Sequence, residues 1–237
     1  MNDDVALTEV LRLDGPAGRL SACLRAPERP SLRAVVAHPH PLYGGTMENA
    51  VVRSVAGRLL AAGAAVLTFD FRGVGESEGS FDDGAGEQLD LLAAERELER
   101  RFPRLPHWLA GYSFGASVAL ARIERRQAPA VDALLVVAPP LAHRRVPTPG
   151  AGSPPLALVT GELDPLTPGA LVRGFASSLP HFACHEIVAA AGHDLGTAGP
   201  PGVEALVGAL DRSIESLLSV RARSASATAP AGGGARH

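Results

Sequence analysis

Residues 107–126 read HWLAGYSFGASVALARIERR, and this stretch contains the change from strand to helix that decides the fold. The run HWLAG is short and apolar, as in a buried strand, whereas the residues from Phe114 onward have helical spacing. Between them lies GYSFG at 111–115, a G-x-S-x-G pentapeptide. Glycines two positions either side of a serine allow a sharp, tightly packed turn that presents its hydroxyl. Ser113 is therefore the candidate nucleophile.

The same alternation of short apolar runs with helical segments extends over most of the chain. Such alternation is typical of an α/β fold with a mostly parallel sheet and helices on both faces. Two weaker segments, 7–13 and 18–24, predict an antiparallel hairpin at the sheet edge. The other predicted strands are 33–37, 64–70, 107–111, 133–138, 156–160 and 182–188, and the predicted helices are 47–62, 86–101, 114–126, 168–178 and 201–219.

The length and composition allow one large core. The chain has 237 residues, of which 46% are hydrophobic and 20% are charged, and α/β folds of this length commonly form one unit. We expect a single domain over residues 1–220. Residues 221–237, RARSASATAPAGGGARH, are rich in Ala, Gly and Ser and have few large apolar groups, so they predict a disordered tail.

The charge balance gives no reason to expect nucleic acid or an anionic membrane as a partner, since the net charge is −3. No apolar run reaches the roughly 20 residues of a membrane span, and the N-terminus does not resemble a secretory signal. Cys23 and Cys184 lie far apart and outside any metal-ligand spacing, so we expect no disulfide framework. We therefore expect a cytoplasmic protein that acts on a small molecule.

A serine nucleophile needs a base beside it and an acid that orients the base. Asp164 follows the predicted strand at 156–160, where a carboxylate would lie at the carboxyl end of the sheet beside the serine turn. His193 comes just after the last predicted strand and before the final helix. We therefore expect Ser113, Asp164 and His193 to act together as nucleophile, acid and base.

Two other carboxylates are alternatives to Asp164. Asp194 is the sequence neighbour of His193, which places it badly for binding the inner nitrogen of the same imidazole. Glu162 is a weaker alternative. Asp164 is therefore the preferred acid.

Acyl hydrolysis also requires hydrogen-bond donors for the oxyanion of the tetrahedral intermediate. We expect the backbone N–H of Phe114, at the start of a helix, to be one of these donors. The loop HPHPLYGGT at 38–46 predicts the second, and because its prolines have no N–H, His40 is our choice. His38 and His40 could share a metal ion, but no third ligand has a matching spacing, so we expect no metal and no cofactor.

The chain resembles a known group, the small lidless α/β-hydrolases related to dienelactone hydrolase and to the bacterial predicted α/β-superfamily hydrolases. The resemblance covers residues from about Leu7 to Ser219 and is carried by HPHPLYGGTMEN at 38–49, FDFRGVGESEG at 69–79, GYSFGA at 111–116 and GELDPLTP at 161–168. It implies an α/β-hydrolase fold, in which Ser113, Asp164 and His193 match the triad and the first loop matches the oxyanion loop.

Many hydrolases carry a helical lid at the place where residues 139–155 stand here. This stretch is rich in proline and has no periodicity, so it predicts a loop and leaves little room for a lid. The site should therefore be open or covered only by a short loop. The relatives usually carry aromatic residues after the final histidine, whereas here Asp194, Leu195 and Gly196 follow it. The resemblance therefore does not identify the substrate.

The group is mostly assigned to carboxylesterases, so the resemblance implies a serine hydrolase that cleaves a carboxylic ester through an acyl-enzyme. A thioester, a lactone or a short amide would use the same residues. We expect substrate contacts from Tyr43, Tyr112 and Leu195. The alternatives are a binding protein that kept the fold and lost turnover, and a serine peptidase, which is less expected without a cap. The oligomeric state cannot be read from the sequence.

Overall fold

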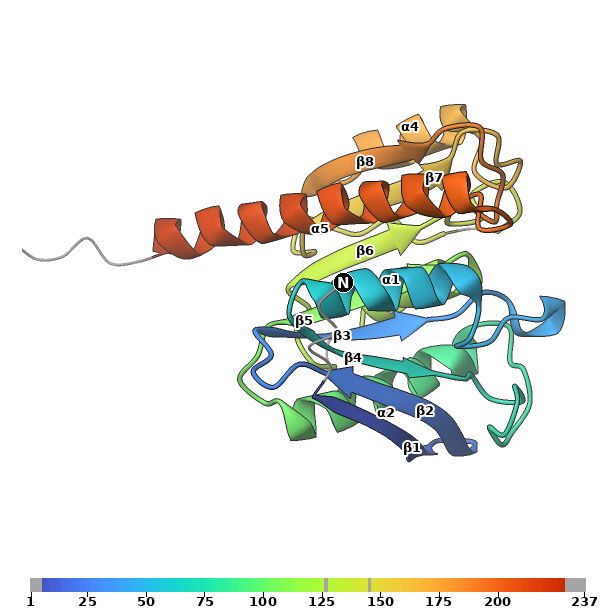
Figure 1. Ribbon diagram of the computed structural model, residues 1–237, viewed down its shortest axis with the longest axis vertical. Coiled ribbons are helices and arrows are strands. Elements are labelled where there is room, and N and C mark those ends of the chain that lie inside the picture. The colour runs from blue at the N-terminus through green and yellow to red at the C-terminus, as the bar shows by residue number, and fades with distance from the viewer. Residues whose placement is uncertain (1–5, 126–127, 145, 229–237) are drawn as a thin grey trace, which may run out of the picture.

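The computed structural model describes residues 6–125, 128–144 and 146–228, and within them an eight-stranded sheet has the order β1-β2-β4-β3-β5-β6-β7-β8 (Figure 1). The strands are β1 (Leu7–Gly15), β2 (Gly18–Ala26), β3 (Leu32–Ala37), β4 (Ala64–Phe69), β5 (His107–Tyr112), β6 (Ala133–Val137), β7 (Leu156–Gly161) and β8 (Phe182–Val188). The helices are η1 (Pro41–Tyr43), α1 (Ala50–Ala61), α2 (Ala85–Arg101), α3 (Phe114–Arg122), α4 (Gly169–Ser177) and α5 (Pro200–Thr228).

The strand directions agree with the predicted sheet. β2 runs antiparallel to both β1 and β4, and the tight β1–β2 connection pairs Gly15 with Gly18. The remaining pairings, from β4–β3 to β7–β8, are all parallel. The prediction of a mostly parallel sheet with an antiparallel N-terminal edge hairpin is therefore confirmed.

Helices cover both faces of this sheet, as Figure 1 shows. α1 and α5 pack on one face, and α2, α3 and α4 pack on the other. The side chains of β5 alternate between the two cores: Trp108 and Tyr112 point toward α1 and α5, whereas Leu109 points toward α2 and α3. Burying each large apolar side chain contributes about 1.5–3 kcal/mol. The sheet is thus packed by one such core on each face.

α1 begins three residues later than the sequence pattern predicts, at Ala50 rather than Met47. The side chain of Asn49 accepts a hydrogen bond from the N–H of Val51 at 2.9 Å and so caps the helix there. The N–H of Met47 instead donates to Asp70 Oδ1 at 2.7 Å. Residues 38–49 are thereby left free to form a loop at the carboxyl ends of β3 and β4.

α5 ends at Thr228, beyond the boundary at residue 220 that we predicted for the domain. The start of the predicted disordered tail is therefore helical, because its Ala and Arg residues have high helix propensity and continue a helix already formed. Residues 229–237 of that tail lie outside the described residues. No helix in the described ranges combines the length and apolarity needed to span a membrane.

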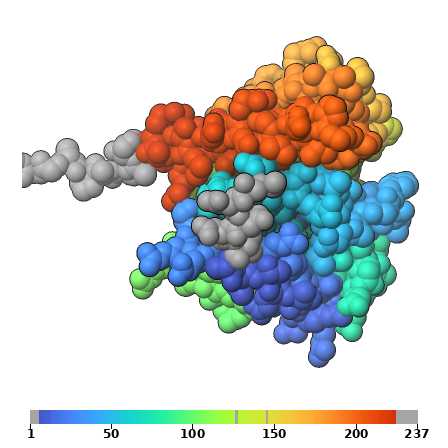
Figure 2. All heavy atoms as spheres, viewed as in Figure 1, coloured from blue at the N-terminus to red at the C-terminus, as the bar shows by residue number. Residues whose placement is uncertain are grey.

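The connection between β6 and β7 forms only turns and bends in its described residues, 138–144 and 146–155. Its prolines and lack of apolar periodicity explain why it forms no helix there. By contrast, the η1 loop at 38–49 projects at the carboxyl edge of the sheet, where Tyr43 is 86% exposed (Figures 1 and 2). Among the described residues, the connection between β6 and β7 therefore places no helical lid over the carboxyl edge of the sheet, where Ser113 lies.

Candidate active site

Ser113 lies in a strained turn between β5 and α3, with φ 55° and ψ −115°. A left-handed φ is unusual for a residue with a Cβ and is tolerated only where the surroundings impose it. The surroundings here are very close. A Cβ on Gly111 would lie 2.4 Å from the carbonyl oxygen of Gly115, and a Cβ on Gly115 would lie 2.3 Å from that of Ala37. Both glycines of the pentapeptide are thus required by close backbone contacts.

The structure brings Ser113, His193 and Asp164 together in one chain of hydrogen bonds. His193 Nε2 lies 2.8 Å from Ser113 Oγ, and His193 Nδ1 lies 2.7 Å from Asp164 Oδ2. The three residues follow β5, β7 and β8, so their meeting is a consequence of the parallel sheet, which places these strand ends along one edge. The imidazole can accept the serine proton while the carboxylate holds its opposite nitrogen.

Asp164 is buried and held as a carboxylate. Thr167 Oγ1 donates to its Oδ2 at 2.6 Å, and the N–H of Leu166 donates to its Oδ1 at 2.8 Å. Burial alone would raise the pKa of Asp164, but the hydrogen bonds from His193 and Thr167 outweigh it and hold that pKa below its ordinary value. Asp164 is therefore negatively charged at neutral pH and can stabilise a protonated His193.

The two alternative carboxylates make other contacts. Asp194 Oδ1 accepts a hydrogen bond from the N–H of Gly196 at 3.2 Å. Glu162 Oε2 accepts one from the N–H of Ala190 at 2.8 Å. The geometry therefore favours Asp164 as the partner of His193.

The two predicted oxyanion donors lie next to each other. The rings of His40 and Phe114 are 4.9 Å apart between centroids. Phe114 is the first residue of α3, so its N–H has no acceptor within the helix. The N–H of His40 has no acceptor among the described residues. Both residues line the same pocket as Ser113, so their N–H groups are candidates for the two oxyanion donors.

His38 anchors the loop that carries His40. Its Nε2 accepts a hydrogen bond from the N–H of Phe71 at 3.0 Å, and its Nδ1 lies 2.6 Å from the carbonyl oxygen of Pro39. One nitrogen thus accepts and the other donates, which is the pattern of a neutral imidazole. Burial lowers the pKa of His38 from 6.5 to about 4. His38 is therefore a neutral structural link between the loops that follow β3 and β4.

This link predicts acid sensitivity of the fold. Because the unfolded chain binds a proton at His38 more tightly, the free energy of unfolding falls as the pH is lowered from about 6.5 to about 4. At pH 4 the protonation of His38 in the unfolded chain lowers the free energy of unfolding by about 3 kcal/mol. This destabilising effect is absent above about pH 6.5. Urea unfolding from pH 4 to 8 should show this slope. In His38→Gln the slope should be smaller, and an equal slope in both proteins would contradict the assignment.

A pocket of about 400 Å³ opens beside Ser113. It is lined by residues of the η1 loop, of the serine turn and of the loops after β6 and β7: His40, Tyr43, Ser113, Phe114, Pro140, His143, Arg144 and Leu166. Tyr43 thus lies where a substrate contact was predicted. The positions of Pro140, His143, Arg144 and Leu166 in this pocket were not predicted, because these residues lie in irregular loops whose path no periodicity predicts.

The predicted substrate contacts of Tyr112 and Leu195 are wrong. Tyr112 is only 5% exposed, and its hydroxyl donates to the carbonyl oxygen of His193 at 2.8 Å. Burial raises the pKa of the Tyr112 phenol, as do the charges of Asp164 and Asp194. Leu195 is fully buried in the core under α1 and α5. Both residues adjoin site residues in sequence, but their side chains point into the core, and Tyr112 supports the His193 loop.

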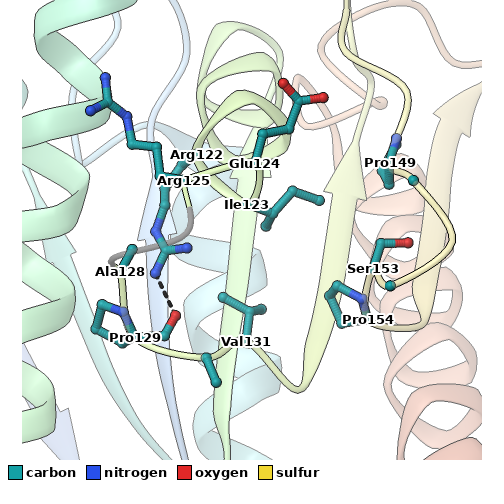
Figure 3. A pocket seen from close by; sticks show the side chains of 13 residues that line it. Arg122, Ile123, Glu124, Arg125, Ala128, Pro129, Val131, Pro149, Ser153 and Pro154 are labelled. Atoms are coloured by element: carbon teal, nitrogen blue, oxygen red, sulfur yellow. Dashed lines mark hydrogen bonds between the residues drawn. The ribbon is translucent and has the colours of Figure 1, made fainter.

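A second hollow, of about 550 Å³, lies at the opposite edge of the sheet (Figure 3). It is formed by the end of α3, the segment before β6 and the loop before β7. Figure 3 shows several polar side chains at its wall, and the buried one among them, Arg122, donates to the carbonyl oxygen of Pro129 at 2.7 Å and pairs with the buried Glu95. Arg122 is thus engaged in structural contacts, and the Ser113 pocket is the stronger candidate site.

Comparisons with known proteins agree with this fold. A lidless α/β serine hydrolase of Xanthomonas campestris is 30% identical, with a TM-score of 0.78, and the match covers 89% of this chain and 94% of that one. An α-β serine hydrolase homologue from Coxiella burnetii is 31% identical, with a TM-score of 0.76 and coverages of 86% and 96%. These matches confirm the α/β-hydrolase fold without a lid.

Sequence comparisons reach a related conclusion. An uncharacterized protein of Rickettsia prowazekii is 40% identical over 132 residues, and the chain matches about half of its length, 54%. The family model described as serine aminopeptidase, S33, matches residues 33–216. The chain therefore belongs to the serine aminopeptidase S33 family and is a hydrolase of the α/β type.

Proposed function

We propose that this protein is a serine hydrolase that cleaves a carboxylic ester of a small substrate through an acyl-enzyme. The observation that carries the proposal is the hydrogen-bonded series from Ser113 through His193 to Asp164, whose serine end lines a pocket. A serine hydroxyl becomes an effective nucleophile when a base of this kind can take its proton.

In the proposed mechanism, Ser113 Oγ attacks the acyl carbon while His193 Nε2 takes the hydroxyl proton. The N–H groups of His40 and Phe114 stabilise the resulting oxyanion, and loss of one such donor typically costs about 3 kcal/mol. His193 then gives its proton to the leaving alcohol. Water attacks the acyl-enzyme by the same route in reverse, and Asp164 stabilises the imidazolium in both halves. No cofactor enters these steps.

The pocket favours an ester over a peptide substrate, although the family description names an aminopeptidase. Recognition of a peptide's protonated amino terminus calls for a carboxylate near the nucleophile. The described pocket lining contains no acidic side chain, and its charged group is the cation Arg144. A small, neutral or anionic ester fits this lining better. We also propose that the enzyme is cytoplasmic and has no nucleic-acid or membrane partner, since the net charge of −3 gives no electrostatic reason to expect either partner.

The purified full chain can distinguish these possibilities. We expect hydrolysis of 4-nitrophenyl acetate and butyrate, with far less activity on L-alanine 4-nitroanilide and on 4-nitrophenyl laurate, because the open pocket offers little apolar enclosure. Release of nitrophenol or nitroaniline measures all four rates. Faster cleavage of the anilide would show a peptidase, and no turnover of any substrate would favour the binding protein that lost its activity.

A further inference from the structure

Arg144 places a guanidinium at the wall of the Ser113 pocket. It comes from the loop after β6, and its Cζ lies 5.1 Å from the centre of the Phe114 ring. Phe114 is the residue that follows the candidate nucleophile. This stacking, together with the contacts of Arg144 with Asp83, holds the cation close to the position where a substrate acyl group would lie.

The charge of Arg144 is only weakly neutralised. Arg144 Nη1 lies 3.0 Å from Asp83 Oδ1, and Arg144 Nη2 donates to the carbonyl oxygen of Asp83. The Asp83 side chain is 82% exposed, so water screens its carboxylate, and exposed ion pairs of this kind are worth little. The Arg144 side chain, by comparison, is 29% exposed. Arg144 is thus a partly buried cation that lines the Ser113 pocket and also a neighbouring hollow beside Asp83, whereas the Asp83 carboxylate lies mostly in solvent.

The carboxylates whose charges act near this site, Asp83 and Glu87, are not among the residues that line the pocket. The described lining includes no Asp or Glu side chain. Burial and the charge of Arg144 lower the pKa of His40, and they outweigh the charges of Asp83 and Glu87, which raise it, so that imidazole is neutral. A guanidinium presents a planar set of donors that matches a carboxylate. An anionic group is the ligand that this pocket can recognise by charge.

We propose that Arg144 selects carboxylate-bearing esters, that is, small substrates with an ester at Ser113 and a free carboxylate at Arg144. This proposal rests on the proposed esterase function and deepens it by naming the substrate class. The carboxylate could belong to the acyl half, as in a dicarboxylic acid monoester, or to the alcohol half, as in an acylated hydroxy acid. Both present the same charge to the same guanidinium.

Matched pairs of substrates test the proposal and separate these two sources. Monomethyl glutarate against dimethyl glutarate places the charge in the acyl half, and 4-acetoxybutanoate against its methyl ester places it in the alcohol half. We expect the anionic member of at least one pair to have the higher kcat/KM, measured by pH-stat titration. In Arg144→Gln the anionic-to-neutral ratio should fall roughly 10- to 100-fold, as for loss of a charge-assisted hydrogen bond.

Two further variants distinguish recognition from a structural role. In Asp83→Asn the anionic-to-neutral ratio of kcat/KM should rise severalfold, because the carboxylate that pairs with Arg144 is removed. If Arg144 only anchored its loop, this variant would instead lower the rates for both members of a pair alike. Arg212→Gln removes an exposed arginine that pairs with Glu186 on the surface, and it should leave the ratio unchanged. A ratio that favours the neutral esters, or one that survives Arg144→Gln, would overturn the proposal.

Binding of glutarate gives a readout that does not require turnover. Calorimetry should show glutarate binding tighter to the wild-type chain than the neutral glutaramide, and this preference should be lost in Arg144→Gln. No preference for glutarate would overturn the role of Arg144 even if esters are cleaved. Conversely, glutarate binding that depends on Arg144 without any ester hydrolysis would support the anion site and contradict only the esterase function.

Discussion

Replacing Ser113 with alanine is expected to lower kcat for 4-nitrophenyl acetate by roughly 10⁴- to 10⁶-fold, the range for loss of a nucleophile that acts as a unit with its base. The substitution removes only the Oγ that lies 2.8 Å from His193 Nε2. The backbone at position 113 has a φ of 55°, and alanine tolerates this conformation no worse than serine does. The loss should therefore appear in kcat without a loss of folding, and steady-state kinetics with circular dichroism would measure both.

Ser117 provides the matched control for this variant. It lies one turn further along α3, is buried, and its Oγ has no hydrogen-bond partner among the described residues. Ser117→Ala should therefore retain wild-type activity. Equal losses in the two variants would show that the decrease reflects damage to the turn between β5 and α3, and retained activity in Ser113→Ala would exclude this serine as nucleophile.

Replacing Asp164 with asparagine should lower kcat by roughly 10³- to 10⁴-fold. The carboxylate contacts the Nδ1 of His193 at 2.7 Å and favours the tautomer whose Nε2 can accept the serine proton. An amide in its place can donate to Nδ1 and favour the opposite tautomer, and it cannot stabilise the imidazolium. Activity of this variant across pH 5 to 9 would measure the loss.

Asp194→Asn is the matched control, because this aspartate adjoins His193 in sequence but accepts its hydrogen bond from Gly196. We expect it to retain most of the activity. The reverse order, with Asp194→Asn inactive and Asp164→Asn active, would assign the orienting role to Asp194. Thermal unfolding of both variants is needed as well, because Asp164 also accepts hydrogen bonds from Thr167 and Leu166.

Much of the architecture could be predicted from the sequence, for reasons visible in particular elements. The strand β5 and the helix α3 have clear apolar patterns, and the glycines between them leave a single place for a sharp turn. Asp164 and His193 follow strands whose carboxyl ends meet at one edge of the sheet, so their order along the chain was enough to predict that they meet Ser113. Their catalytic roles stay predictions.

Side-chain direction was harder to predict than position along the chain. Tyr112 adjoins the nucleophile, but strand alternation places it in the same core as Trp108, and this period of two was a signal that could have been used. Leu195 lies in a turn with a φ of 54°, where no repeating pattern gives the orientation of the side chain. Sequence adjacency to a site residue is thus a weak guide to contact with substrate.

Loops and helix ends account for the remaining differences. The position of Arg144 beside Ser113 depends on turns in the connection between β6 and β7 and on contacts with Asp83, which lies far away in sequence. The extension of α5 to Thr228 shows that an Ala- and Arg-rich segment can continue a helix that is already packed, although it has few apolar groups of its own. Composition alone predicted neither feature.

The most direct test of the account is to find which atom reacts. The intact chain can be treated with a fluorophosphonate and digested with trypsin, and the modified residue located by fragmentation in the mass spectrometer. Cleavage after arginine yields residues 105–122, a peptide that contains both Ser113 and Ser117. We predict a single phosphonyl group on Ser113, absent from Ser113→Ala. A phosphonyl group on any other residue, or no modification at all, would contradict the assignment of Ser113 as an activated nucleophile.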